Sequence, residues 1–113
     1  MADAHKNFAY STVAVVPSPA DTGLSLTVAS GHGGRFPAVS FNAVVWPASV
    51  LPTPVNAEVV RVTAIVGDVL TIVRAQESST ARTIVVGDQI AAAITVKSLT
   101  DIEGQAVDTF GAT

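Results

Sequence analysis

The apolar residues of this chain show no sustained 3.6-residue period, so the pattern argues against amphipathic helices. Val is abundant, and Thr and Ile follow, a composition that favours β-strands. Turn-forming groups such as PSPADTG, SGHGG and two Gly-Asp pairs separate the apolar stretches. The pattern predicts strands over residues 9–16, 24–29, 42–46, 58–66, 69–74 and 89–97.

Many short strands with Gly and Pro between them predict an all-β fold. We expect a small β-sandwich or β-barrel of about six to eight short antiparallel strands, with extended terminal arms. The expected division is an N-terminal arm over 1–7, a β-domain over 8–103 and a C-terminal tail over 104–113. Thr100 is a candidate N-cap for about one helical turn, which Gly104 would end.

The pair Gly67-Asp68 gives the strongest local prediction, a two-residue type II′ hairpin, because Gly adopts positive φ without steric cost. This register sets Arg61 opposite Arg74, a like-charge pair that costs up to ~1 kcal/mol unless Glu58 or Glu77 intervenes. A four-residue loop would move the arginines apart, and the sequence leaves both registers open. The two-residue register pairs Val66 with Val69, Ala64 with Thr71 and Val62 with Val73. The Val-Gly-Asp of 66–68 recurs at 86–88, which indicates reuse of one turn.

Composition adds one unusual feature, a surface poor in charge. Apolar residues make up 49% and charged residues 13%, against roughly 25% charged in ordinary soluble domains. We therefore expect apolar surface that meets another protein. The alternative is a compact Ala- and Val-rich domain with a neutral Ser/Thr surface.

Several classes of partner and site are disfavoured. Six basic residues and a net charge of −3 argue against nucleic acid and against anionic membrane surfaces. The uncharged run 36–57 contains Pro37, Pro47, Pro52 and Pro54, which excludes a straight transmembrane helix. The first ten residues lack the apolar stretch of a signal peptide. Cysteine is absent, and we predict no metal site, no cofactor and no small-molecule substrate.

The polar loop 74–82 is the first candidate for chemistry. Glu77 as base, Ser78 or Ser79 as nucleophile and two arginines as anion clamps would make a catalytic site. An activated Ser needs a positioned His or Lys base, and none lies nearby in sequence, so we predict no catalytic residues. The favoured interpretation is a structural corner in which Arg74 pairs with Glu77. Its predicted members are Glu58, Arg61, Arg74, Gln76, Glu77 and Thr80.

Two further segments carry weaker signals. The stretch SGHGGRF at 30–36 matches neither a phosphate loop nor an oxyanion loop in context, so we expect a flexible turn with an exposed His32. Phe36, Phe41 and Trp46 lie within eleven residues and would suit a sugar-binding platform; the alternative places Phe41 and Trp46 in the core. The predicted contact surface comprises Phe8, Tyr10, Phe36, Phe41, Trp46, Pro47 and Leu51.

Most of the chain, over roughly residues 8 to 103, resembles a small domain that recurs in virion proteins of tailed bacteriophages. The resemblance rests on FAYSTVAVVPSPADTGLSLTVASGHGGRFP, FNAVVWP and NAEVVRVTAIVGDVLTIVRAQESSTARTIVVGDQI. Its most specific residues are Glu58, Val60-Arg61-Val62, Gly67-Asp68, Leu70-Thr71, Arg74, Gln76-Glu77, Thr80-Ala81 and Gly87-Asp88. Related sequences are expected to have Arg-Gly-Gln-Glu-Gly where this chain has Ala and Ser at positions 75 and 78.

The resembling domain occurs in head-decoration and head-fibre proteins and in the base of some tail fibres. The resemblance implies β-rich packing, attachment to a virion, often as a homotrimer, and no catalysis. Partners would be the major capsid protein or other virion proteins, and the protein would be made in the host bacterial cytoplasm. Fibres usually continue into a shaft, so the few residues after Glu103 favour capsid decoration. A tail or fibre adaptor and a carbohydrate-binding module using Trp46 and Phe36 are the alternatives.

Overall fold

The structure, a computed structural model, describes residues 6–92. Most of the predicted N-terminal arm, the helical turn at Thr100 and the tail over 104–113 lie outside the described residues. The same holds for the second half of the strand predicted over 89–97.

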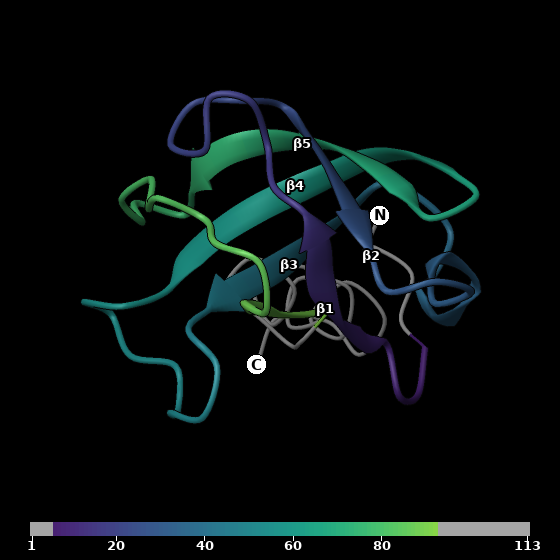
Figure 1. Cartoon of the computed structure of the whole chain (residues 1–113), viewed down its shortest axis with the longest axis horizontal. Helices are drawn as coiled ribbons and strands as arrows, with labels where there is room; N and C mark the ends of the chain where they lie inside the picture. Colours follow the sequence, from purple (N-terminus) through teal and green to yellow (C-terminus); the bar gives the residue numbers. More distant parts are fainter. Residues whose placement is uncertain (1–5, 93–113) are drawn as a thin grey trace, which may run out of the picture.

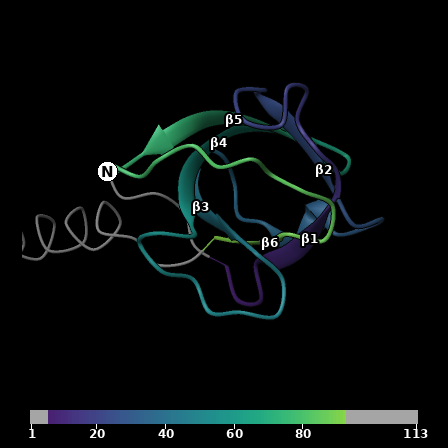
Figure 2. The same cartoon turned by 60° about the vertical axis from the view of Figure 1, so that its left-hand side comes forward.

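Six antiparallel strands form a closed barrel, which confirms the predicted all-β class and selects the barrel over the sandwich. The order around the barrel is β1-β2-β5-β4-β3-β6, and the ring is visible in Figure 1 and, turned, in Figure 2. Closure leaves no unpaired sheet edge among these strands. The bounds are β1 Tyr10–Val15, β2 Ser25–Val28, β3 Phe41–Trp46, β4 Glu58–Val66, β5 Val69–Gln76 and β6 Gln89–Ala91, with a 3₁₀ turn, η1, at Gly33–Arg35.

The β4–β5 hairpin has the two-residue turn that the sequence predicts. Gly67 has a φ of +62° while Asp68 is not in the positive-φ region, as a type II′ turn requires. Val66 pairs with Val69 and Ala64 with Thr71. Beyond them a register shift pairs Val62 with Ile72 rather than Val73. The two-residue register therefore does not continue along the hairpin.

That shift resolves the question of the two arginines. Arg61 lies opposite Val73, so the like-charge pair that the unbroken register would create is absent. A second shift, between Val59 and Arg61, lets Val59 pair with Gln76. Such β-bulges bend a strand and redirect its side chains. Here they turn Arg74 toward the barrel end where β4 begins.

The core fills the barrel interior. Alternate residues of each strand point inward, as the period of two requires. Phe36, just before β3, stacks on Phe41, with ring centroids 6.1 Å apart and planes 12° apart. The buried apolar residues are Ala9, Val13, Leu26, Val28, Phe36, Phe41, Ala43, Val45, Val60, Val62, Leu70, Ile72, Ile84 and Ile90.

The segment between β5 and β6, residues 77–88, crosses the end of the barrel where β4 begins (Figure 2). The Ile84 amide donates to the Ala20 carbonyl at 3.2 Å, and the Ile84 side chain is buried. The Gly87 amide donates to the Val13 carbonyl at 2.9 Å. This segment therefore closes the barrel end that carries the polar residues described next.

Candidate functional site

Glu58, the first residue of β4, points into the barrel and is completely buried. Its carboxylate accepts two hydrogen bonds from the Arg74 guanidinium, at 2.8 and 2.9 Å. It also accepts from the Ala75 amide at 2.8 Å and from the Arg82 amide at 3.0 Å. A buried carboxylate is costly unless paired and fully hydrogen-bonded, and four donors meet that condition here.

Arg74 joins three separate segments of the chain. Besides Glu58, its guanidinium donates to the carbonyls of Ala20, Gly23 and Arg82, with the shortest of these contacts 2.7 Å long. Its side chain is only 8% exposed. All of these acceptors belong to the protein, so the cation acts as a fixed cross-brace rather than as an anion clamp.

A second ion pair continues this brace. Arg82 donates to the Asp88 carboxylate at 2.8 and 3.1 Å and to the Asn56 carbonyl at 2.9 Å. Asp88 also accepts from the Val85 amide at 3.0 Å and is buried. Arg82 therefore fastens the crossing segment to the loop before β4. Glu58, Arg74, Arg82 and Asp88 are hereafter the charged corner.

The charged corner favours the ionised form of the Glu58 carboxylate. Burial by itself raises the pKa of Glu58, but the hydrogen bonds from Arg74 and from the Arg82 and Ala75 amides, with the charge of Arg74, bring that pKa below its ordinary value. A general base needs a pKa near the working pH and access to a substrate proton. Glu58 has neither, so the charged corner is a structural device.

Side chains of the loop that follows Arg74 also form hydrogen bonds with the backbone. The Ser79 hydroxyl donates to the Gln76 carbonyl at 2.6 Å and accepts from the Val59 amide at 2.9 Å. The Gln76 side-chain amide donates to the Arg74 carbonyl at 3.1 Å. Arg74 pairs with Glu58 and not with Glu77, which corrects the expected pair. The loop is a corner of the fold, as the favoured interpretation has it.

Glu77 belongs to a second polar cluster. The Asn42 side-chain amide donates to the Glu77 carboxylate at 2.7 Å. Arg61 donates to the side-chain oxygen of the same Asn42 at 3.0 Å. Asn42 lies on β3 and Arg61 is its partner on β4, so Asn42 bridges two charged residues. Thr80, the remaining predicted member of the corner, is exposed.

Three residues of this loop have backbone conformations that favour Gly. Ala75, Glu77 and Ser78 have φ values of +52°, +52° and +63°. A side chain in this region clashes with its own backbone at a cost of roughly 1–2 kcal/mol. Positions 75 and 78 are the two at which the phage domain is expected to have Gly. In this chain Ala75 and Ser78 have the left-handed backbone.

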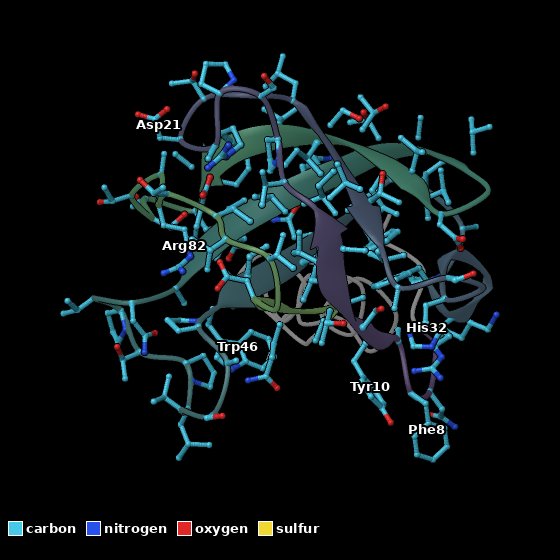
Figure 3. All side chains as sticks on the ribbon, in the orientation of Figure 1. Phe8, Tyr10, Asp21, His32, Trp46 and Arg82 are labelled. Carbon is cyan, nitrogen blue, oxygen red and sulfur yellow. The ribbon has the colours of Figure 1, made fainter. Side chains whose placement is uncertain are left out.

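The opposite end of the barrel holds the SGHGGRF loop, near His32 in Figure 3, far from Arg82. The Asp68 carboxylate accepts from the Gly31 amide at 3.0 Å and the Gly33 amide at 2.9 Å. These bonds lower the pKa of Asp68. A Cβ on Gly33 would lie 1.8 Å from the Gly67 carbonyl oxygen, so only Gly fits.

His32 is half-buried rather than exposed, and its Nδ1 lies 2.7 Å from the Ser11 hydroxyl. The expected flexible turn is therefore a loop anchored to the β4–β5 turn by Asp68 and to β1 by this contact. The two Val-Gly-Asp turns use their Asp differently. The Asp68 carboxylate accepts backbone N–H groups of a loop distant in sequence, whereas Asp88 accepts the Val85 N–H of its own turn.

The predicted contact surface is only partly on the outside. Phe36 and Phe41 are buried in the core, which removes them from that surface and from the predicted sugar platform. Trp46 and Pro47 are half-buried, and the Trp46 indole donates to the Val50 carbonyl at 3.0 Å. Phe8, Tyr10 and Leu51 are exposed, and Phe8 and Tyr10 appear together in Figure 3. Arg35 lies 5.4 Å from the centre of the Tyr10 ring.

Sequence reasoning named Leu51 but did not extend the predicted contact surface to Val55. Val50 and Val55, in the same connection between β3 and β4, are 50% and 96% exposed. The signal was present in the sequence, because residues 47–57 contain no charged residue and three prolines. Val85 and Val86 of the crossing segment are exposed as well.

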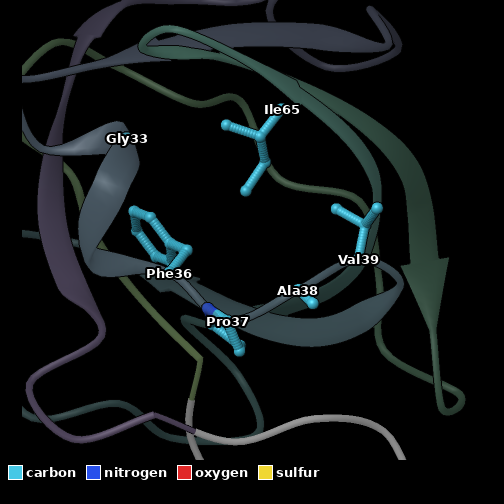
Figure 4. Close-up of a pocket in the computed structure, with 6 residues that line it drawn as sticks. All are labelled: Gly33, Phe36, Pro37, Ala38, Val39 and Ile65. Atoms are coloured by element: carbon cyan, nitrogen blue, oxygen red, sulfur yellow. The ribbon is translucent and has the colours of Figure 1, made fainter.

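The hollows on the described surface are shallow and mostly apolar. One, of about 400 Å³, is lined by Gly33, Phe36, Pro37, Ala38, Val39 and Ile65 (Figure 4). It holds no titratable side chain, so it offers no acid or base. Over residues 6–92 no group of His, Asp or Glu has metal-binding spacing. No helix in the same part of the chain is long and apolar enough to cross a membrane.

Comparison with known proteins gives no family: no protein-family model matches the chain, and no curated protein does so either.

Proposed function

We propose that this protein is a structural component of a tailed-phage virion, a decoration protein that binds the outer surface of the head as a homo-oligomer. One observation carries the proposal. A barrel with no open edge nevertheless exposes many large apolar side chains, among them Phe8, Leu51, Val55 and Val86. Three exposed apolar residues, Val50, Leu51 and Val55, share the connection between β3 and β4, and apolar residues gathered in this way mark sites of protein contact.

The use of the charged residues supports the same conclusion. Glu58 pairs with Arg74 and Arg82 pairs with Asp88, and all four side chains also bind backbone groups. Asp68 binds backbone amides. Ser79, one of the two candidate nucleophiles of the loop over 74–82, donates to a main-chain carbonyl. The proposal accordingly assigns no chemical step, no cofactor and no small-molecule substrate to the protein.

The loop geometry is a further support. The phage domain that the sequence resembles is expected to carry Gly at positions 75 and 78, and both positions have positive φ in this structure. A shared backbone geometry would explain why Gly is usual there. The chain's Ala75 and Ser78 are then local departures within a retained corner.

The direct test is to look for the protein in purified virions by mass spectrometry and to locate it by immunogold labelling. Label on the head is the expected result. Label at the tail would replace the head proposal with the tail-adaptor alternative. Absence of the protein from purified virions would overturn both.

A further inference from the structure

Two basic side chains lie together beside η1, at the end of the barrel where Figure 3 labels Tyr10. The Lys6 ammonium donates to the Gly34 carbonyl at 2.7 Å. The guanidinium of the next residue, Arg35, lies 5.4 Å from the centre of the Tyr10 ring and donates to the Tyr10 carbonyl at 3.4 Å. Lys6 and Tyr10 are exposed, and Arg35 is half-buried. Lys6, Tyr10 and Arg35 are hereafter the basic face.

The cations of the basic face lack the carboxylate partners that the charged corner has. Each arginine of the charged corner is paired with a carboxylate at 2.8 Å. Within residues 6–92, neither Lys6 nor Arg35 forms an ion pair. Asp68 lies at the same barrel end, but both of its carboxylate oxygens accept backbone amides of the SGHGGRF loop. The basic face therefore presents two positive charges and an aromatic ring, with no counter-charge from the described residues.

The chain leaves the barrel next to the basic face. Ala91 of β6 pairs with Tyr10 of β1, and the Ala92 amide donates to the Ala9 carbonyl at 2.8 Å. The chain after Ala92 therefore starts beside Tyr10. Asp101 follows nine residues later, and nine residues span at most about 30 Å. The residues around Asp101 are thus within reach of the whole basic face.

The sequence that follows has the complementary charge. Residues 98–113, here named the 98–113 segment, contain Asp101, Glu103 and Asp108 and no Lys, Arg or His. Exposed ion pairs are individually weak. A short tether nevertheless holds two groups of one chain at a high effective concentration, so weak pairs suffice for a contact within the chain.

We propose that the 98–113 segment docks on the basic face of its own chain, with its carboxylates against Lys6 and Arg35. The occupant follows from charge complementarity and from the point at which the chain leaves the barrel. The contact lies within one chain, so this inference goes beyond the proposed function and does not depend on it. Docking would cover Tyr10, which the sequence placed in the contact surface.

The absence of cysteine allows a single nitroxide label in the whole chain, at Ala106→Cys. A nitroxide broadens the NMR signals of nearby amides, so docking should broaden those of Gly34 and Arg35. Lys6→Gln combined with Arg35→Gln should lower the relaxation enhancement at Gly34 by about threefold, because both ion pairs are lost. Asp21→Asn, a charge change at the exposed residue near the opposite end in Figure 3, is the control and should leave it unchanged.

The reciprocal change tests the contact without altering the barrel. Asp101→Asn, Glu103→Gln and Asp108→Asn together should also lower the enhancement at Gly34 by about threefold. No broadening at Gly34, or broadening that neither set of substitutions changes, would overturn the docking. In a mixture of isotope-labelled chain without nitroxide and unlabelled chain with it, the Gly34 signal should stay sharp. Equal broadening in that mixture would assign the basic face to the segment of a second copy and overturn the contact within one chain.

Discussion

Each end of β4 has a carboxylate that accepts several hydrogen bonds, and one of the two is buried while the other lies near the surface. At its start Glu58 accepts four hydrogen bonds inside the barrel, two of them from a nearly buried arginine. Just past its end Asp68 accepts two backbone hydrogen bonds near the surface. Both carboxylates tie a distant loop to the barrel. Only the buried carboxylate has a cation for a partner.

The difference between the two carboxylates shows that a buried charge requires an opposite charge beside it, whereas a charge near water does not. Water screens Asp68, so two amide donors suffice to orient it. Glu58 is out of water, and removal of its partner would leave an uncompensated charge in a medium of low dielectric. The two ends should therefore respond differently when one component is removed.

Glu58→Gln should have the largest effect on stability. The change keeps the shape but leaves the Arg74 cation without its counter-charge, and breaking a buried pair in this way costs about 3–5 kcal/mol. Urea unfolding of the variant measures the loss. Asp21→Asn, at an exposed acid, is the control and should stay within about 0.5 kcal/mol of the natural chain. A loss below about 1 kcal/mol for Glu58→Gln would mean that the pair is not needed.

At the other end the strongest effect should come from packing rather than charge. Gly33→Ala places a Cβ 1.8 Å from the Gly67 carbonyl oxygen, and the backbone must move. Overpacking of this kind costs roughly 1–3 kcal/mol. The neighbour Gly34 is a matched control, since a Cβ there meets nothing within 4 Å. Equal thermal stability of the Gly33→Ala and Gly34→Ala proteins would contradict the close docking of this loop.

A smaller effect of opposite sign is expected at the corner after Arg74. Ala75→Gly and Ser78→Gly relieve a left-handed strain of roughly 1–2 kcal/mol, part of which the extra freedom of Gly in the unfolded chain cancels. Each should raise stability by about 0.5–1 kcal/mol. Ala81→Gly, at an exposed position without positive φ, should instead lower it slightly. Destabilisation by the first two changes would show that the loop does not need this geometry in solution.

Acid titration should distinguish the contributions of Glu58 and Asp68 to stability. The pKa values of Glu58 and Asp68 are both lowered in the folded protein. Their stabilising contributions are therefore complete above the unfolded pKa, near 4.5 for Glu58 and 3.8 for Asp68, and are lost as pH falls through the lower folded values. Unfolding free energies measured from about pH 6 to pH 2 give the profile. Glu58→Gln should flatten it below pH 4.5, and Asp68→Asn should flatten it less.

The sequence was sufficient for the elements that depend on neighbours in the chain. Strand positions and the turn at Gly67-Asp68 follow from local pattern and backbone chemistry. Glu58 and Arg74 were both named as structural residues, but their pairing was assigned to Glu77, which is nearer in sequence. The true pairing depends on bulges in the β4–β5 register, which no local pattern encodes.

For one region the sequence also did not determine which apolar residues are buried and which are exposed. The run 36–57 carries no charge, so it offers little contrast between buried and exposed faces. Phe36 and Phe41 were therefore assigned to a contact surface although they stack in the core. Val55 was overlooked although it is almost fully exposed. Only strand pairing decides which of these apolar residues face water.

The central claim is that the charged residues hold this barrel together while the uncharged connection between β3 and β4 makes the contacts with other proteins. The most direct measurement is the native mass of Leu51→Asp and of the natural chain by light scattering, over a range of concentrations, with a urea unfolding curve on each sample. We predict an oligomer for the natural chain and a monomer of 11.5 kDa for the variant, which should still unfold in one cooperative urea transition because Leu51 is exposed. A natural chain that stays monomeric throughout, or a variant that keeps the natural mass, would contradict the claim.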